Sequence, residues 1–266
     1  MTVSALFSRD NDWFHPTPFT TGPWRPDAMH GGPPSALMAL AIHEALQPEE
    51  QVARVGVDLE KPVPLEPMQL HCARRQVSRR VAHLTVELRT STHIVASARA
   101  LLLRGQGPVP LIDMVQQVAP ALPAAVLDSS DPDQWATQPH IFHRDAVEAR
   151  FTTGDWGIPG PGTAWMRLTV PLIAGEPTPD LCQLMAVADF GSALSQAVEP
   201  GSGVALINVD VNVTLAGAPA GPWFCIATQG SVSQAGIGLA TTQLFDSNGP
   251  LGVITQSQIV YAAPRG

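Results

Sequence analysis

The chain is poor in charged residues, and it has fewer basic than acidic side chains. Charged residues make up 14% of its 266 residues, and 15 Lys and Arg against 23 Asp and Glu leave a net charge of −8. Nucleic-acid binding needs clustered Lys and Arg, so this balance speaks against a nucleic-acid partner. Apolar residues make up 45% of the chain. Together with the low share of charged residues, this indicates a large core or contact with further copies of the chain.

Other absences narrow the class of protein. The 3 cysteines are an odd number without close spacing in apolar contexts, so we expect reduced core thiols in a cytoplasmic protein. We expect no signal peptide, because no apolar h-region follows the first residues. No apolar run reaches the length of a membrane span. There is no Gly-x-Ser-x-Gly motif for a serine hydrolase, and no His, Cys and Asp spacing that predicts a metal or another cofactor.

The most distinctive stretch is Met-His-Gly-Gly-Pro-Pro at residues 29–34, followed by an apolar run that reaches Leu46. Proline is tolerated in the first helical turn, and nearly every face of the run is apolar, so it predicts an enclosed helix over 34–46. Free N–H groups at its N-terminus would suit a carbonyl oxygen or a phosphate. A buried core helix that follows a tight turn is the simpler interpretation, and on this stretch alone both stay open.

Strand periodicity follows the helix. Apolar and polar residues alternate near 55–60, 68–72, 81–89 and 94–103, which predicts four strands joined by short turns. A helix followed by such strands is typical of an antiparallel meander wrapped around one helix. Residues 105–140 are punctuated by prolines, and we interpret them as a connector between an N-terminal unit, 1–104, and a C-terminal unit, 141–266.

The pattern then returns. We predict strands at 147–153 and 165–170, a second apolar helix at 181–198, and strands at 206–215, 223–230, 238–245 and 252–261. Asn248-Gly249 is a strong hairpin signal. Val57-Asp58 in the first half matches Val209-Asp210 in the second at a spacing of 152 residues. This repeat predicts two copies of one fold, whose sheets can join edge to edge and so remove an exposed edge from each.

A long apolar helix wrapped by an antiparallel sheet, duplicated in tandem, resembles the α+β double hotdog fold. The motifs are similar to those of the bacterial acyl-CoA thioesterase II-like proteins. The supporting stretches, which together span most of the chain, are residues 24–34, 164–167, 171–176, 188–190, 207–210, 236–240 and Gln256. The resemblance implies an enzyme of fatty acid metabolism that hydrolyses an acyl-CoA substrate to the free acid and CoA, without a cofactor.

The resemblance also implies site residues. Such proteins orient a water for attack on the thioester carbonyl with an Asp, a Thr or Ser, and a Gln on three strands; by position these are Asp210, Ser231 and Gln256. Ser231 departs from the more frequent Thr but keeps the hydroxyl. The backbone amides of Gly31 and Gly32 would polarise the thioester oxygen, and His30 beside them can touch the substrate.

The residues themselves leave alternatives open. Asp210 lies on the polar face of an alternating strand, where a solvated carboxylate is the ordinary interpretation. His30 can equally be a capping or solvated residue. Asp189 is a charge inside an otherwise apolar helix, which is costly unless the charge is paired. We favour a structural partner for Asp189 over a role as a second catalytic carboxylate.

Two other functions are compatible with the fold. One is a catalytically silent protein that binds acyl-CoA or another acyl ligand. The other is an acyl-thioester hydratase or dehydratase, which would be expected to show an Asp/His pair near the N-terminus of a helix. The sequence shows no such pair in the required order. The sparse charge also predicts a homo-oligomer, since the outer faces of the fused sheet remain to be buried.

Overall fold

The computed structural model describes residues 4–107, 109, 117–124, 139–156, 158–198 and 202–262. Most of the predicted connector at 105–140 therefore lies outside the described residues. The first half contributes β3 (Glu50–Asp58), β4 (Gln69–Ser78), β5 (Val81–Arg89) and β6 (Ile94–Arg104). The second half contributes β7 (Val147–Thr153), β8 (Gly162–Leu168), β9 (Val204–Asn208), β10 (Asp210–Leu215), β11 (Phe224–Val232), β12 (Ile237–Asp246) and β13 (Gly249–Ala262).

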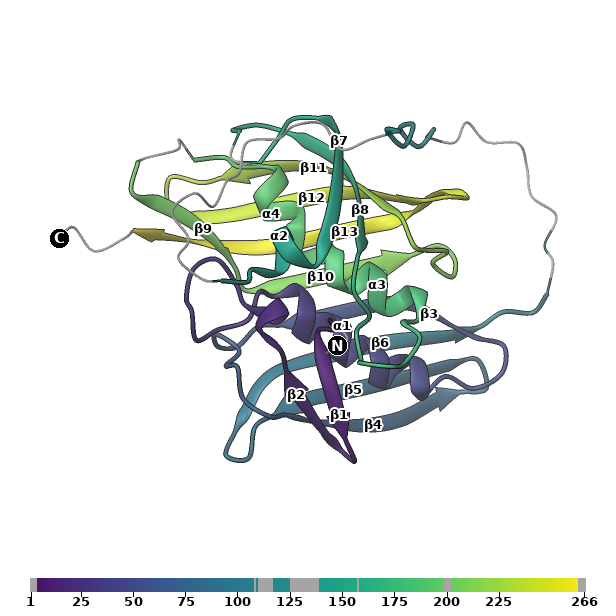
Figure 1. Cartoon of the computed structure of the whole chain (residues 1–266). Helices are drawn as coiled ribbons and strands as arrows, with labels where there is room; N and C mark the ends of the chain where they lie inside the picture. Colours follow the sequence, from purple (N-terminus) through teal and green to yellow (C-terminus); the bar gives the residue numbers. More distant parts are fainter. Residues whose placement is uncertain are drawn as a thin grey trace.

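These strands form one continuous antiparallel sheet in the order β4-β5-β6-β3-β10-β13-β12-β11-β8-β7, with β9 beside β13 (Figure 1). A separate hairpin of β1 (Phe7–Asp10) and β2 (Trp13–Pro16) precedes it. The predicted turn at Asn248-Gly249 is confirmed, because β12 and β13 pair around it. Cys182 and Cys225 are buried as expected, but the prediction of a core thiol is wrong for Cys72, which is exposed on the edge strand β4.

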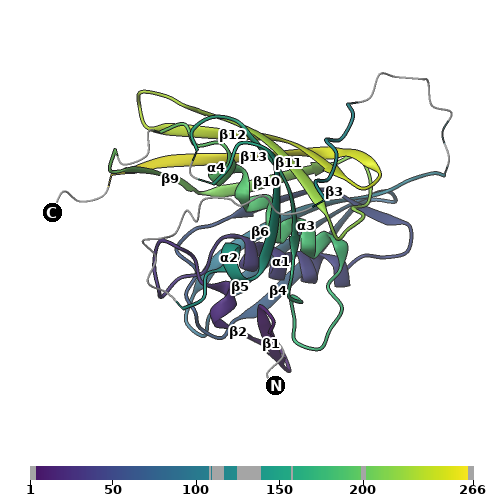
Figure 2. The ribbon, with the colours of Figure 1, turned by 45° about the horizontal axis from the view of Figure 1, so that its top comes forward.

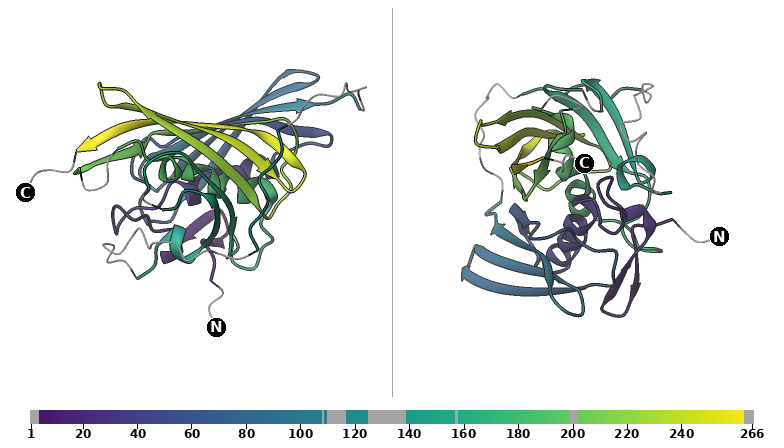
Figure 3. Two further views of the ribbon diagram at one scale, coloured as in Figure 1. Left: turned by 90° about the horizontal axis from the view of Figure 1, so that it is seen from above. Right: turned by 90° about the vertical axis from the view of Figure 1, so that its left-hand side faces the viewer.

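Two helices fill the concave side of the sheet. Helix α1 (Gly32–Glu44) is buried from Gly32 to Ile42, and it packs against α3 (Asp180–Val187) (Figure 2). The views in Figure 3 show both helices on one side of the curved sheet. The predicted enclosed helix is confirmed, and it begins two residues earlier than the sequence pattern indicates. Each half is thus a helix wrapped by antiparallel strands, as expected for a double hotdog.

The two halves join through β3 and β10. Val57 pairs with Val211 and Asp58 with Asp210 in an antiparallel register. The repeat therefore brings equivalent strands together at the centre of the sheet, and the predicted edge-to-edge fusion is confirmed.

The second apolar helix is not continuous. The sequence predicts one helix over 181–198, whereas α3 ends at Val187, a 3₁₀ turn spans Ala188–Phe190, and a short α4 (Gly191–Leu194) follows. The carbonyl oxygen of Asp189 accepts side-chain hydrogen bonds from Asn208 Nδ2 at 3.1 Å and Gln256 Nε2 at 2.9 Å. Strand side chains thus satisfy this carbonyl, which a regular helix would pair with its own backbone.

The strand predicted over 206–215 is also divided. Asn208 pairs with Gln258 and Asn212 with Thr255, so three residues, 209–211, lie opposite two, 256–257. This extra residue is a β-bulge, which shifts the alternation of side chains by one position. As a result Asn208 points toward the helices, whereas Asp210 points away from them.

Candidate active site

Asp189 lies at the break between α3 and α4, where side chains from both halves meet. It is 7% exposed. Its Oδ1 accepts a hydrogen bond from Asn208 Nδ2 at 3.0 Å, and its Oδ2 lies 3.1 Å from His30 Nδ1. The N–H of Gly31 at the start of α1 also donates to the carboxyl group. A buried carboxyl with partners on a helix terminus, a histidine and a strand is the arrangement expected of a functional acid or base.

The environment of Asp189 raises its pKa. Burial raises the pKa to about 6 and outweighs the opposing hydrogen bonds from Asn208 and the Gly31 N–H. Ionised carboxylates lose hydration energy when buried, whereas donors that face the carboxylate favour its charged form. A carboxyl with a pKa near neutrality can exchange a proton within the physiological pH range, as a general base must.

The N-terminus of α1 is built to bring Asp189 close. A Cβ on Gly31 would lie 2.5 Å from Asp189 Oδ2, and a Cβ on Gly32 would lie 2.2 Å from the carbonyl oxygen of Ala186 in α3. The glycine pair therefore allows the carboxyl and the neighbouring helix to approach the backbone. The Gly32 N–H is directed at His30 Nδ1, at 3.1 Å. In this structure the two amides expected to polarise a thioester oxygen thus donate to Asp189 and His30.

Gln256 completes the polar group from β13. Its side chain is fully buried, and its Nε2 binds the carbonyl oxygen of Asp189. Its Oε1 is buried without a hydrogen-bond partner among the residues that the structure describes. A Cβ on Gly191 would lie 2.1 Å from this oxygen, so only a glycine leaves room for it there. A buried acceptor without a protein partner is a place where a water or substrate donor would be stabilised.

The structure does not bring the three sequence-predicted water-binding residues together. Asp210 points to the opposite face of the sheet, where it accepts hydrogen bonds from Ser257 Oγ at 3.1 Å and from Asn212 Nδ2 at 3.0 Å. Ser231 is exposed on β11, and β12 lies between β11 and the strand of Gln256. Only Gln256 joins Asp189, and it does so beside His30 and Asn208.

Aromatic rings surround this polar group. The ring of Phe190 lies 4.8 Å from that of His30, and the ring of Phe142 lies 5.1 Å from it. Trp156 packs against Phe190 at 5.8 Å. The rings fix the plane of the imidazole and lower the local dielectric constant, which strengthens the electrostatic interactions of Asp189.

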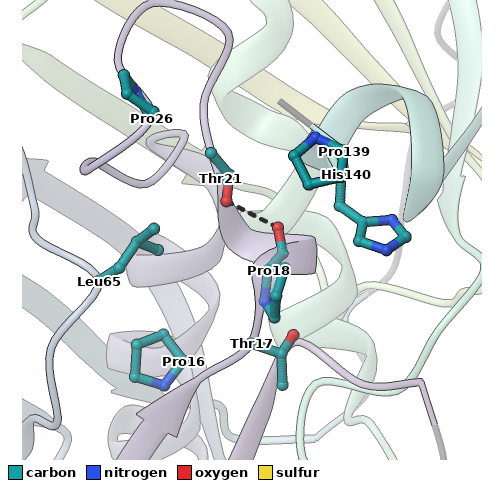
Figure 4. A pocket seen from close by; sticks show the side chains of 8 residues that line it. All are labelled: Pro16, Thr17, Pro18, Thr21, Pro26, Leu65, Pro139 and His140. Carbon is teal, nitrogen blue, oxygen red and sulfur yellow. Dashed lines mark hydrogen bonds between the residues drawn. The ribbon is translucent and has the colours of Figure 1, made fainter. Parts of the chain in front are cut away.

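A cavity of about 400 Å³ lies beside the α1 N-terminus but does not include Asp189 (Figure 4). It is lined by Pro16, Thr17, Pro18, Thr21, Pro26, Leu65, Pro139 and His140. It adjoins the site through the backbone, because the His30 N–H donates to the carbonyl oxygen of Thr20 and the Phe142 N–H to that of Thr21.

No group of three His, Cys, Asp or Glu residues in the described ranges could hold a metal ion. None of the described helices is long and apolar enough to cross a membrane.

Comparisons with known proteins identify the family and the fold of the chain. A family model described as the acyl-CoA thioesterase N-terminal domain matches residues 20–103, and one described as the C-terminal domain matches residues 121–260. No curated protein sequence matches the chain at a significant level.

Among solved structures, a putative thioesterase from Novosphingobium aromaticivorans is 21% identical, with a TM-score of 0.71 over 97% of this chain and 99% of that one. Acyl-CoA thioesterase II TesB2 from Mycobacterium marinum is 14% identical, with a TM-score of 0.65 over 97% and 95%. The dehydratase domain of the CurJ module of curacin polyketide synthase is 13% identical, with a TM-score of 0.55 over 98% of both chains. These likenesses show the double hotdog fold.

Proposed function

This chain belongs to the acyl-CoA thioesterase family, and we propose that it hydrolyses the thioester bond of an acyl-CoA to release the free acid and CoA. The observation that carries the proposal is the buried carboxyl of Asp189, which side chains and a helix terminus from both halves of the molecule hold in place. Fatty acid metabolism in the cytoplasm is the proposed setting, in keeping with an acyl-CoA substrate and three unpaired cysteines.

In this proposal Asp189 takes the role that the sequence assigned to Asp210. The carboxylate accepts a proton from the attacking water, and Gln256 Oε1 accepts a second hydrogen bond from the same water. Asn208, in place of Ser231, holds Asp189 Oδ1 so that the carboxylate keeps one orientation. Orienting groups of this kind lower the entropy cost of bringing the water and the carbonyl together.

The amides of Gly31 and Gly32 remain the proposed stabilisers of the oxyanion. Each such donor contributes ~3–4 kcal/mol to the transition state in known oxyanion holes. Because the two amides donate to Asp189 and His30 in this structure, the substrate oxygen has to replace one of those acceptors. Asp189 or His30 then gives up its hydrogen bond from the N-terminus of α1 when the substrate binds.

A thiol-release assay with acyl-CoAs of graded chain length tests the function. We expect release of CoA for at least one chain length, at a rate that depends on Asp189. If every acyl-CoA raises the melting temperature and none yields CoA above background, the silent acyl-CoA-binding protein is the correct description instead.

One observation favours a second candidate, an acyl-thioester hydratase or dehydratase. The sequence shows no Asp/His pair in the required order, but the fold brings His30 and Asp189 within 3.1 Å at the N-terminus of α1. Such a pair can move protons on the acyl chain as well as on water. With an enoyl-CoA as substrate, loss of the ultraviolet absorbance of the conjugated double bond without release of CoA would identify this activity.

We also propose a homo-oligomer, formed through the outer side of the second half. The outward side chains of β9, β12 and β13 include no charged residue within the described strands, and we call this surface the uncharged face. One end of it carries a row of isoleucines, Ile207, Ile259 and Ile237, which pair across the three strands and are 38%, 49% and 65% exposed.

A second copy of the chain is the occupant that this surface fits. A two-fold contact brings the same patch of both copies face to face, so a patch of one charge sign would repel its copy, whereas an uncharged apolar surface can pack on itself. Interface cores are depleted in charged residues for the same reason. The outer side of the first half carries more charge, because Arg54, Asp58, Arg99 and Glu87 lie on it. In the second half, Asp210 of β10 borders the uncharged face through its hydrogen bond with Ser257.

A further inference from the structure

His30 reaches Asp189 from the other half of the molecule and is held in one orientation. Its Nδ1 lies 3.1 Å from Asp189 Oδ2 and 3.1 Å from the backbone nitrogen of Gly32. Phe142 and Phe190 pack against its ring, and its side chain is 13% exposed. With Nδ1 committed to Asp189, the opposite edge of the ring carries Nε2.

The contacts of Nδ1 define two arrangements of one proton. When the proton is on Asp189 Oδ2, the carboxyl O–H and the Gly32 N–H share the single lone pair of Nδ1 as their acceptor. When the proton moves to Nδ1, the pair becomes a carboxylate and an imidazolium, and the Gly32 N–H loses its acceptor. One short proton transfer thus supplies a base at Asp189, an acid at Nε2 and a backbone donor at Gly32 together.

Thioester hydrolysis needs all three groups. The water has to lose a proton, the carbonyl oxygen gains negative charge, and the sulfur departs with an electron pair. The thiol of CoA is aliphatic, like that of cysteine, whose pKa is about 8.5, so its thiolate leaves more readily when an acid protonates it. Of the side chains that contact the Asp189 carboxyl in this structure, Asn208 cannot deliver a proton, whereas the imidazolium of His30 can.

We propose that His30 is the acid that protonates the departing sulfur of CoA, an inference that rests on the hydrolytic function proposed above. The oxygen of the water bonds to the thioester carbon while one of its protons passes to the Asp189 carboxylate. The carbon–sulfur bond then breaks, its electron pair goes to sulfur, and Nε2 of His30 gives its proton to that sulfur. After the acid and CoA leave, the proton on Asp189 returns to solvent and Nε2 takes one up, which restores the starting pair.

The leaving group provides the test. The same acyl group is presented as a CoA thioester and as a thioester of 5-thio-2-nitrobenzoate, an aromatic thiol acidic enough to leave unprotonated. We expect His30→Gln to lower kcat/KM by ~10²–10⁴-fold on the CoA thioester, the usual contribution of a general acid, and by less than ~10-fold on the aryl thioester. An equal loss on both substrates would overturn the proposal, because a structural role of His30 does not depend on the leaving group.

His143→Gln is the matched control. The His143 ring lies 6.0 Å from that of His30, within the same aromatic group. We expect any effect of this change to be equal on the two thioesters. If His30→Gln fails to fold, the wild-type enzyme decides with a series of thiols of graded pKa. A shallow dependence of the rate on thiol pKa supports an enzymatic acid, and a steep one overturns it. Wild-type protein that cleaves neither thioester would instead refute the hydrolytic function itself.

Discussion

Asp58 and Asp210 lie directly opposite each other in the antiparallel pair of β3 and β10. They are the residues that the internal repeat equates, and the junction of the two halves brings them together. Both point away from the helices, as the burial of their neighbours Val57 and Val211 on the opposite side shows. This symmetry makes them a pair of matched controls for any carboxylate on the helix side of the sheet.

We predict that Asp189→Asn lowers kcat for thioester hydrolysis by ~10²–10⁴-fold, the range for loss of a general base. The amide keeps the size of the side chain, so the fold and acyl-CoA binding should survive, and thiol release together with thermal unfolding would measure both. Asp58→Asn and Asp210→Asn should leave turnover within a few-fold. Normal turnover in Asp189→Asn and a large loss in Asp210→Asn would restore the assignment made from the sequence.

The elements of the fold could be predicted from the sequence because their signals are local. The apolar run after residues 29–34, the period-2 strands and the Asn248-Gly249 turn each depend on neighbouring residues alone. The repeat of Val57-Asp58 at Val209-Asp210 predicted two copies of one fold whose sheets can join, and the structure adds that β3 and β10 form the junction. The break of the second helix was missed, because the side chains that take up the Asp189 carbonyl come from strands that follow it.

The site was harder to predict, and the bulge at 209–211 is the main reason. The sequence alternates cleanly through 206–215, so it predicted Asn208 and Asp210 on one face, and nothing in it marks the extra residue. The bulge reverses the assignment and places Asn208, not Asp210, beside the helices. A charge in an apolar helix was the available signal for Asp189, but its partner His30 lies in the other half of the sequence.

The raised pKa of Asp189 predicts how stability depends on pH. The folded protein binds this proton more tightly than the unfolded chain, whose Asp pKa is about 4. The group therefore stabilises the fold fully below pH ~4, and its contribution is lost as pH rises through about 6. The loss is on the order of 3 kcal/mol, since one pKa unit corresponds to about 1.4 kcal/mol.

Asp189→Asn removes this dependence together with the contact to His30, and it leaves the titrating groups that do not touch Asp189 in place. The difference in unfolding free energy, wild type minus variant, should therefore fall between pH 4 and pH 7 in urea titrations. Asp145 and Glu148, whose pKa values are lowered by arginine partners despite burial, contribute with the opposite sign but cancel in the comparison. A difference that rises with pH would mean that the carboxyl is held ionised in the folded state.

Gly32 is predicted to be required for the packing of α1 on α3. In Gly32→Ala the new methyl would lie 2.2 Å from the carbonyl oxygen of Ala186 and 2.8 Å from Phe142 Cε1, so the helices have to separate. Overpacking of this kind costs about 1–3 kcal/mol, and the backbone oxygen cannot turn aside as a side chain would. Gly217→Ala, where a Cβ meets nothing within 4 Å, should change the urea midpoint little. Equal midpoints in the two variants would contradict the close approach.

The uncharged face gives the last prediction. If two copies pack through it, the wild-type protein should sediment well above the monomer mass of 28.2 kDa. Ile259 lies in the middle of the isoleucine row, so Ile259→Lys would bury an unpaired charge in the contact. We expect this variant to sediment as a monomer, with its melting temperature still that of a folded protein. Thr85→Lys adds the same charge on the outer side of the first half, where it is exposed, and should leave the oligomer intact. A wild-type protein that sediments at 28.2 kDa, or an Ile259→Lys oligomer as stable as the wild type, would rule out this face as the contact.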